Sequence, residues 1–507
     1  VGLLLVLVTW ALATLPRGAA LVSLFLFALG LALRLPHLDV PFVRDQDVQR
    51  VFTGHASWGD IFMGIGLRDR HPPLYFAILH VAQWFGQAER VVRMPAVISA
   101  ALMGPAFALA AVVLGRRVAL AAIVALVPTV AFAFVSYSRE VSSLPFHALT
   151  LVLLTTAVAK DLSAGTRLRS AAVVACVAIA LFTFYTAVFP VLAVLLLLMG
   201  GGADRARARR DVAFGLLAGS PALLLAVGTF FRDQGARAAA STQPNVAWGN
   251  ASTLELARGM RDLLVEAVGP VALVAVVVAG LLAMKRRDTV VLLPLAVFVA
   301  TFLGIAGLTS VARVQPYYLL AAVPALLLAV ALTVPPVLRG AGEGTSLLLA
   351  VGVALSVVPT VAAVGTLYLP DERASMPVFV DVITRRSERR VVTIAHYDMP
   401  LVAYYVARAR GVEVDFSSLE QGRAMTPIRG TDVVLFPIVQ THTSNDTLEA
   451  DAVAALEAVI ADGPCLVIDR PTLRLDGLQA RLTRCERLAE GADSALYRCA
   501  PEDTAAR

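Results

Sequence analysis

The sequence contains few charged residues. Asp, Glu, Lys and Arg make up 16% of its 507 residues, whereas about a quarter is usual in globular proteins. Hydrophobic residues make up 58%, against roughly 45–50% in ordinary soluble chains. A disordered protein would show the opposite bias, and a soluble fold of this size cannot bury so much apolar surface. The composition therefore predicts a multi-spanning membrane protein.

Cysteine is scarce as well, and the common nucleotide- and zinc-binding patterns are missing. Four cysteines are too few for a disulfide scaffold, and no Cys-x-x-Cys pair or His/Cys cluster predicts a zinc site. No Gly-rich loop opens a helix in the polar tail, which argues against nucleotide binding there. Cys465, Cys485 and Cys499 lie in this tail, so one disulfide can form if the tail is extracytoplasmic.

The net charge of +6 is divided unevenly along the chain. Residues 1–370 contain 27 Lys and Arg and 16 Asp and Glu, a net of +11, and residues 371–507 have a net of −5. The excess positive charge thus lies in the apolar part of the chain. Contact with lipid headgroups and the orientation of the spans during translocation explain it better there than binding to a nucleic-acid backbone does. We expect the lipid bilayer as a partner and no nucleic acid.

Eleven apolar runs have about the length that a helix needs to cross ~30 Å of hydrocarbon. They lie near residues 19–35, 93–115, 118–136, 141–159, 170–185, 186–200, 212–231, 264–284, 289–307, 315–334 and 345–366. Basic residues collect at every second junction, and by the positive-inside rule those junctions face the cytoplasm. These junctions contain Arg17, Arg116–Arg117, Lys160 to Arg169, Arg205 to Arg210, Lys285–Arg287 and Arg339. We expect eleven spans in the cytoplasmic (inner or plasma) membrane, or twelve if residues 1–15 also cross.

The apolar stretch 72–86 fits this alternation only if it does not cross the membrane. It is short, begins at His71-Pro72-Pro73 and contains His80 and Gln83, so we expect a half-inserted or surface helix. Residues 36–92 then form the first outward loop of a membrane domain that comprises residues 1–366. The other outward segments are 136–140, the turn near Tyr185, 232–263, 308–314 and everything after residue 367.

Residues 371–507 have the pattern of a small extracytoplasmic α/β domain. Apolar, partly β-branched runs predict strands, and stretches with helical spacing lie between them. The strands are expected at 391–395, 412–416, 432–438 and 465–468, and the helices at 400–410 and 448–460. Strands that alternate with helices favour a mostly parallel sheet.

The first outward loop is rich in ionisable residues. It contains Arg44-Asp45-Gln46-Asp47 and, after a predicted amphipathic helix, Leu67-Arg68-Asp69-Arg70-His71-Pro72-Pro73-Leu74-Tyr75. Charges collect outside membranes in any case, so this pattern alone also fits an ordinary solvated loop.

An ordered series of motifs within residues 30–330 resembles the C-type (GT-C) integral membrane glycosyltransferases. The resemblance is to the protein O-mannosyltransferase-like and aminoarabinose-transferase-like group, which has an Asp-Glu pair after the first span and a later His-Pro-Pro-Leu-Tyr-Tyr motif. Asp45 matches the first acid and His71 to Tyr75 match the second motif. Further matches are Val92-Arg93-Met94-Pro95-Ala96, Gly115-Arg116-Arg117, Tyr137-Ser138-Arg139-Glu140, Pro316-Tyr317-Tyr318-Leu319-Leu320 and Val323-Pro324-Ala325-Leu326.

The resemblance implies an all-α polytopic GT-C membrane domain that transfers a sugar from a polyprenyl-phosphate donor to an envelope acceptor outside the cytoplasmic membrane. The acceptor attacks the anomeric carbon and the lipid phosphate leaves, so a single displacement inverts the configuration. A loop carboxylate that takes the acceptor proton contributes typically ~10²–10⁴-fold. Fixed cations beside the leaving phosphate stabilise the charge that develops on it.

The same resemblance suggests which residues take part. Gln46 stands where the family has Glu and the second acid is displaced to Asp47, so the base is Asp45, or Asp47 as alternative or partner. Tyr317 stands where the family often has Arg, with Arg313 just before it. The expected donor-phosphate and substrate contacts are His71, Arg93, Arg139, Glu140, Arg313, Tyr75 and Tyr318.

Each of these residues also has a plainer interpretation. Asp47 can be a solvated loop acid or a helix amino-terminal charge, and His71 can cap the helix that begins at Pro72. Arg139 and Glu140 can form an interfacial ion pair, and Arg93 can extend along the membrane surface. The remaining residues, Tyr75, Tyr317 and Tyr318, can be interfacial aromatics.

Two other functions fit part of the pattern. A transporter or flippase of lipid-linked sugars would place ionisable residues at mid-membrane and often show inverted repeats, whereas here most charges lie at span ends. A catalytically silent envelope scaffold is the second, because Gln46 replaces an expected acid. The sugar and the acceptor (glycan, lipid or protein) stay open, as does a divalent metal, since two carboxylates and a phosphate could hold one.

Overall fold

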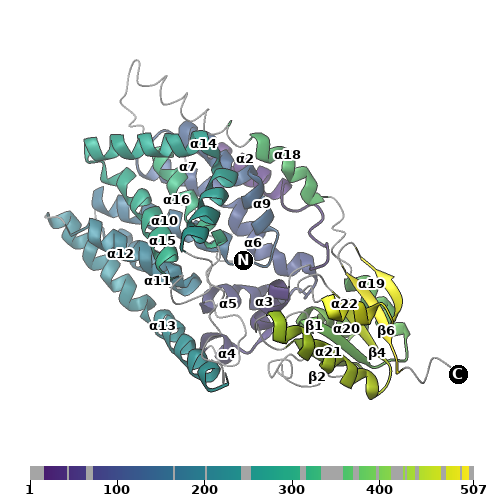
Figure 1. Ribbon diagram of the computed structural model, residues 1–507. Coiled ribbons are helices and arrows are strands. Elements are labelled where there is room, and N and C mark those ends of the chain that lie inside the picture. Colours follow the sequence, from purple (N-terminus) through teal and green to yellow (C-terminus); the bar gives the residue numbers. More distant parts are fainter. Residues whose placement is uncertain are drawn as a thin grey trace. The chain divides into compact units, whose positions relative to one another are not determined.

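The computed structural model describes residues 16–42, 45–63, 72–163, 166–199, 202–240, 253–308, 316–332, 355, 358–368, 376–395, 399–412, 426–428, 431–439, 445–469, 476–491 and 494–501 (Figure 1). The chain forms two compact units. Unit 1 comprises Val1–Leu38, Ser57–Gly64 and Arg70–Leu369, and unit 2 comprises Asp39–Ala56, Ile65–Asp69 and Pro370–Arg507. The boundary near residue 370 lies where the composition changes, but unit 2 also includes part of the first loop.

Unit 1 is built from helices and short 3₁₀ turns. Its helices are α2 (Arg17–Ala32), α4 (Trp58–Met63), α5 (Pro73–Gln83), α6 (Glu89–Ala101), α7 (Met103–Val113), α8 (Val118–Val130), α9 (Phe132–Ser138), α10 (Leu144–Ser163), α11 (Arg167–Thr183), α12 (Val188–Leu197), α13 (Ala203–Ala240), α14 (Thr253–Arg286), α15 (Thr289–Leu308), α16 (Val323–Leu332) and α18 (Val358–Val364). The 3₁₀ turns are η1 (Tyr185–Ala187), η2 (Pro316–Ala321) and η3 (Gly365–Tyr368). The expected spans fall on one helix or on two consecutive helices, and the expected span 264–284 includes a break at Gly269 within α14. Only parts of 315–334 and 345–366 lie within the described residues.

The helices vary in how well they match the thickness of a bilayer. Among the described residues, two stretches, Glu89–Val113 and Thr289–Gly307, are long and apolar enough to cross a membrane on their own. Two bent helix pairs raise the number to four if each pair forms one span, and one of these is α8 with α9, bent by 59°. The chain is a multi-pass membrane protein, and the count of eleven or twelve spans stays a prediction.

Helix α5 coincides with the apolar stretch that was expected not to cross. Its 11 residues correspond to a length of about 16 Å at 1.5 Å per residue, about half the thickness of the hydrocarbon layer. This length agrees with a half-inserted or surface helix. Residues 1–15, the other ambiguous segment, lie outside the described part of the chain.

Glycines allow the helices of unit 1 to pack closely. A Cβ atom added to Gly104 of α7 would lie 2.6 Å from the Cβ atom of Leu26 on α2. At Gly304 of α15 it would collide with the ring of Phe189 on α12. Small residues at helix crossings bring backbones together, which is how membrane helices gain van der Waals contact where the hydrophobic effect is weak.

Two ion pairs join helix ends that the charge pattern assigns to the cytoplasm. Arg116, in the turn between α7 and α8, donates to Asp288, which precedes α15, at 2.9 Å. Arg207 of α13 lies 3.6 Å from Asp161 of α10. In both pairs, the partners come from different junctions that were predicted to face the same side of the membrane.

Unit 2 contains a six-stranded sheet with the order β2-β3-β1-β4-β6-β5. Its strands are β1 (Arg390–Ala395), β2 (Thr426–Pro427), β3 (Val434–Val439), β4 (Cys465–Asp469), β5 (Glu486–Glu490) and β6 (Ala495–Cys499). Its helices are α3 (Asp45–His55), α19 (Met376–Arg385), α20 (Met399–Ala409), α21 (Asn445–Ala461) and α22 (Asp476–Leu482). The α/β prediction for the tail is confirmed, while the expected strand 412–416 lies outside the described residues beyond Val412.

The sheet is mixed, so the prediction of a mostly parallel sheet is wrong. Strand β1 pairs in parallel with β3 and β4, whereas β2, β5 and β6 pair in antiparallel orientation. The tight chain reversal between β5 and β6 supplies the antiparallel edge. Alternate side chains of β1 and β4 are buried against α21 and α22, and the intervening residues Val391 and Leu466 are also fully buried. Both faces of the central strands are therefore covered.

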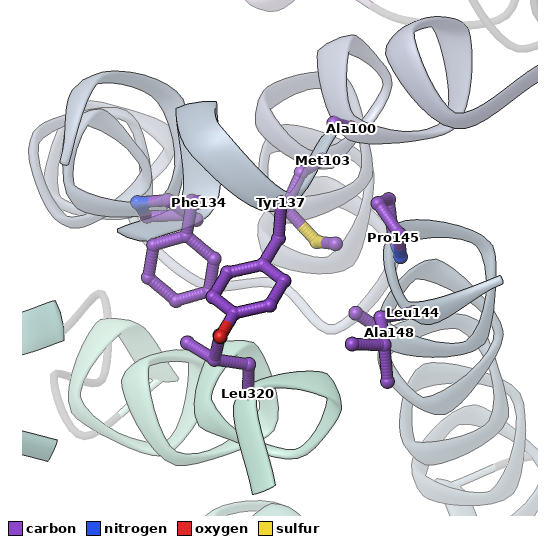
Figure 2. A pocket seen from close by; sticks show the side chains of 9 residues that line it. Ala100, Met103, Phe134, Tyr137, Leu144, Pro145, Ala148 and Leu320 are labelled. Atoms are coloured by element: carbon purple, nitrogen blue, oxygen red, sulfur yellow. The ribbon is translucent and has the colours of Figure 1, made fainter. Parts of the chain in front are cut away.

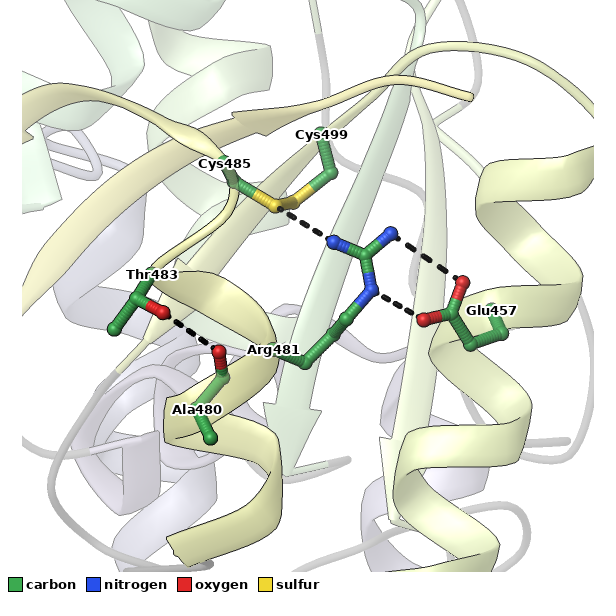
Figure 3. The surroundings of a disulfide bond; sticks show 6 residues. All are labelled: Glu457, Ala480, Arg481, Thr483, Cys485 and Cys499. Carbon is green, nitrogen blue, oxygen red and sulfur yellow. Dashed lines mark hydrogen bonds and ion pairs between the residues drawn. A yellow bond between two sulfur atoms is a disulfide. The ribbon is translucent and has the colours of Figure 1, made fainter. Parts of the chain in front are cut away.

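A disulfide joins Cys485 to Cys499 in unit 2, as the cysteine pattern allowed. It connects the segment before β5 to the end of β6 (Figure 3). The guanidinium group of Arg481 on α22 points toward this disulfide and forms an ion pair with Glu457 of α21. The disulfide and the ion pair together hold the edge of the sheet to the helices that cover one face.

Candidate active site

The acid-bearing part of the first loop forms helix α3 of unit 2. Asp45 is its first residue, at the end where the helix dipole favours negative charge, and its side chain lies outside the described part. Asp47 is 3% exposed, and its Oδ1 atom lies 3.8 Å from the Nη1 atom of Arg50. The interpretation of Asp47 as a freely solvated loop acid is therefore wrong.

Three arginines of unit 1 gather around the segment that leads from α2 toward this helix. Arg93 of α6 is 7% exposed and donates to the carbonyl oxygen of Leu38 at 2.8 Å. Arg139, which follows α9, donates to the preceding carbonyl oxygen, that of His37, at 3.1 Å. The structure therefore brings Arg93 and Arg139 together on consecutive peptide groups, and Arg93 does not extend along an exposed surface.

Arg34 is the third cation and is fully buried. Its Nε atom donates to the hydroxyl of Ser138 at 2.7 Å, and Nη1 donates to the carbonyl of Gly30 at 3.0 Å. It also donates to the carbonyls of Thr129 and Pro128, at 2.9 and 3.1 Å. These last carbonyls lie where α8 ends at its break from α9. The guanidinium thus caps a helix carboxyl end, where a cation is favoured by the helix dipole.

His37 has a backbone conformation that fits its place in this arrangement. Its φ angle is 50°, in the left-handed region that non-glycine residues seldom adopt. Arg139 binds the carbonyl of this same residue. Because such a conformation persists only where neighbouring contacts impose it, the arginine contact is part of what shapes the exit from α2.

A chain of aromatic rings lies at the same helix ends of unit 1. Tyr137 contacts Tyr317 at a centroid distance of 5.4 Å, and Tyr317 contacts Tyr318 at 4.8 Å. The chain continues from Tyr318 to Phe184 at 5.4 Å and from Phe184 to His147 at 5.0 Å. Residues 34–38, 128–139 and 316–320 therefore meet, and we call this region the loop end of unit 1.

A small apolar cavity of about 30 Å³ opens at the loop end. Figure 2 shows the ring of Tyr137 between Phe134 and Leu320, with the hydroxyl directed toward Leu320. The lining residues are Ala100, Met103, Pro128, Phe134, Tyr137, Leu144, Pro145, Ala148 and Leu320. Tyr137 contributes the only hydroxyl among the side chains that line this cavity. Pro128 lines the cavity, and its carbonyl oxygen also accepts a hydrogen bond from Arg34.

The other predicted site residues have varied surroundings. Tyr75 is 1% exposed within unit 1, so it is not an exposed interfacial aromatic. Glu140 and Tyr318 are half-buried. His71 and Arg313 lie outside the described residues. No group of three His, Cys, Asp or Glu side chains that could hold a metal ion occurs among the described residues.

Sequence reasoning assigned no role to two residues that define the loop end. Arg34 ends an apolar run, where a charge normally indicates the membrane surface, and only the structure shows its buried acceptors. Tyr137 belongs to the same motif as Arg139 and Glu140, so this motif could have indicated Tyr137 as a further site residue. Both residues belong to unit 1, whereas Asp45 and Asp47 belong to unit 2.

Comparison with known proteins rests on structure. No protein-family model matches the chain, and no protein of curated function matches it. The structure of ArnT from Cupriavidus metallidurans bound to undecaprenyl phosphate matches with a TM-score of 0.56 at 14% identity, covering 96% of this chain and 98% of that one. The apo structure of the same protein matches with a TM-score of 0.54 over the same shares.

A second protein shares this architecture. The oligosaccharyltransferase of Archaeoglobus fulgidus, in complex with Zn and sulfate, matches with a TM-score of 0.54 at 12% identity over 88% of this chain and 67% of that one. These structural neighbours are C-type glycosyltransferases. The chain has the GT-C fold. The ordered motifs had indicated this fold, and the match to ArnT extends it over nearly the whole length.

Proposed function

We propose that the protein transfers a sugar from a polyprenyl phosphate to an acceptor of the cell envelope, at the outer face of the cytoplasmic membrane. The observation that carries the proposal is the loop end of unit 1, where Arg93 and Arg139 donate to the carbonyls of Leu38 and His37 and Arg34 binds Ser138. A leaving phosphate accumulates negative charge, and oriented guanidinium groups stabilise it. The ArnT structure with the same fold contains undecaprenyl phosphate, which fits a donor of this class.

Leu38, whose carbonyl oxygen binds Arg93, lies a short way before Asp45 in the sequence. The seven residues from Leu38 to Asp45 can extend over at most about 25 Å. We propose Asp45 as the general base, with Asp47 as its partner or alternative. In this mechanism the carboxylate accepts the proton of the acceptor hydroxyl or amine as it attacks the anomeric carbon, and the bond to the phosphate oxygen breaks with inversion. Arg93 and Arg139, with His71, Arg313, Glu140, Tyr75 and Tyr318, are proposed to orient the donor.

Two observations support the proposed orientation in the membrane. The predicted cytoplasmic junctions contact one another through Arg116–Asp288 and Arg207–Asp161, and the predicted outward junctions contact one another at the loop end. The Cys485–Cys499 disulfide supports an extracytoplasmic unit 2, because disulfides persist in oxidising compartments. We therefore propose that unit 2 and the loop end face outward.

The test is the double substitution Asp45→Asn with Asp47→Asn in the full-length protein. Transfer from the lipid-phosphate sugar should be abolished while membrane insertion and the Cys485–Cys499 disulfide are retained, because Asn keeps the shape but cannot accept the proton. Each single variant shows which acid is the base. Undiminished transfer by the double variant would refute the proposed mechanism.

A further inference from the structure

Helix α3, which begins at Asp45, is attached to unit 2. Helix α3 belongs to the same compact unit as residues 370–507 and packs against α20 (Figure 1). The acid-bearing helix thus shares a core with the carboxy-terminal domain, although more than 300 residues of sequence separate them.

A backbone hydrogen bond fixes the start of this attachment. The N–H group of Phe42 donates to the hydroxyl oxygen of Tyr405 on α20 at 2.6 Å. Phe42 is fully buried and Tyr405 is 6% exposed, so the bond lies out of solvent. A buried backbone N–H group that loses its acceptor lowers the stability of the fold. The Tyr405 hydroxyl therefore stabilises the position of Phe42.

Aromatic packing holds the rest of the helix. The ring of Tyr404 contacts Phe42 at 5.5 Å and Phe52 at 6.5 Å, both edge to face. Val48 and Val51, on the buried side of α3, are almost inaccessible. An isolated helix of 11 residues is marginal in water, so these contacts stabilise α3 in place of intrinsic helix propensity.

We infer that the carboxy-terminal domain positions the catalytic acid, and that Tyr405 is the positioning residue through which it does so. This inference rests on the proposed function. Phe42 precedes Asp45 by three residues and Asp47 by five, so the bond to Tyr405 fixes the chain just before the acids. A base must lie within about 3 Å of the heavy atom whose proton it accepts, and a misplacement of 1 Å can cost about 100-fold.

The test uses Tyr405→Phe in the full-length protein, which removes the hydroxyl and keeps the ring. Amide hydrogen exchange in the peptide covering residues 45–55 should become about tenfold faster, because α3 opens more easily without the bond. In the transfer assay kcat should fall about tenfold with the KM for the donor unchanged, because the donor contacts lie in unit 1. Phe52→Leu, which changes the α3 side of the contact, should speed exchange in α3 about threefold and lower kcat about threefold.

The matched control is Tyr497→Phe, another tyrosine of the same domain, on β6. Exchange of α3 and kcat should stay at the wild-type values in this variant. The thiol of Cys465, which is fully buried, should label slowly in all variants if the domain stays folded. This label separates loss of positioning from unfolding of unit 2.

Each outcome has a distinct meaning. The inference is overturned if Tyr405→Phe leaves α3 exchange unchanged, or if α3 loosens while kcat stays at the wild-type value. Failure of the proposed function has a different signature, in which the Asp45→Asn, Asp47→Asn protein still transfers sugar. Hydrogen exchange in α3 reports on the attachment to unit 2 in either case.

Discussion

Three arginines of unit 2 can be compared with Arg34 at the loop end of unit 1, because their described partners differ in charge. In unit 2, Arg498 pairs with Glu388, Arg481 with Glu457, and Arg487 with Glu490 at 3.1 Å. At the loop end of unit 1, the hydrogen bonds of Arg34 run to three carbonyls and a hydroxyl. A carboxylate neutralises a guanidinium group, whereas backbone carbonyls fix its orientation. Arg34 thus holds the break between α8 and α9 to the end of α2, whereas Arg481 and Glu457 join α22 to α21 in unit 2.

The largest expected effect comes from Arg34→Met. The substitution keeps much of the volume but leaves the buried carbonyls of Pro128 and Thr129 without this donor. We expect the free energy of unfolding to fall by about 3 kcal/mol or more, as is typical when buried polar groups lose a charged partner. Thermal unfolding of the detergent-solubilised protein, followed by circular dichroism, measures it. Arg498→Met in unit 2 should cost only about 1 kcal/mol, because Arg498 is partly exposed. Equal losses of stability in the two variants would contradict a larger structural role for the buried Arg34.

An intermediate effect is expected at the glycine crossings of unit 1. Gly304→Ala places a methyl group against the ring of Phe189 and should lower the free energy of unfolding by about 1–3 kcal/mol, as overpacking does. Gly307→Ala, one turn later in α15, meets no atom within 4 Å and is the matched control. It should be neutral or slightly stabilising, since alanine favours the helix by up to about 1 kcal/mol. Similar melting temperatures for both variants would contradict close packing of α12 and α15.

The smallest effect concerns pH and Glu388 of unit 2. Burial raises the pKa of this carboxyl group, but a backbone hydrogen bond and Arg498 outweigh burial, and the net pKa is lowered. A lowered folded-state pKa means that ionised Glu388 stabilises the domain above its unfolded pKa of about 4.3, and that this stability is lost as the pH falls through the folded value. Glu388→Gln should therefore cost about 1 kcal/mol at pH 7 and flatten the loss of stability in acid.

Asp469 at the end of β4 supplies the opposite case for comparison. Burial raises the pKa of its carboxyl group, and the hydrogen bond from Gln479 lowers it by less. Its contribution is therefore present below the unfolded pKa and is lost as the pH rises through the folded value. Asp469→Asn should be neutral or stabilising at pH 7, as measured by the labelling rate of the Cys465 thiol in the variant and in the wild-type protein. For Glu388, a Glu388→Gln protein that loses stability in acid as steeply as the wild type would contradict the lowered pKa of this carboxyl group.

The sequence predicted most helices of unit 1 because apolar runs of membrane length need no long-range information. It also predicted β1, β3, β4 and α20, whose apolar residues are nearly continuous, and α21 from the helical spacing of its apolar residues. The edge strand β5 was missed because its sequence, Glu-Arg-Leu-Ala-Glu, is mostly polar and exposed.

The candidate site was less predictable. Asp47 and Arg139 came from motifs, but the membership of α3 in unit 2 depends on Tyr404 and Tyr405, far along the chain. The apolar face of α3, with Val48 and Val51, would suit a membrane surface equally well. Burial of Arg34 was not predictable either, since its acceptors come from the break between α8 and α9.

The most direct test of sugar transfer uses purified protein with undecaprenyl phosphate linked to radiolabelled sugars, including mannose and aminoarabinose, in vesicles that contain envelope acceptors. We predict release of free undecaprenyl phosphate together with label on an acceptor, with the anomeric configuration inverted. Movement of the intact labelled lipid across the bilayer without cleavage, for every donor tested, would contradict it and indicate a flippase.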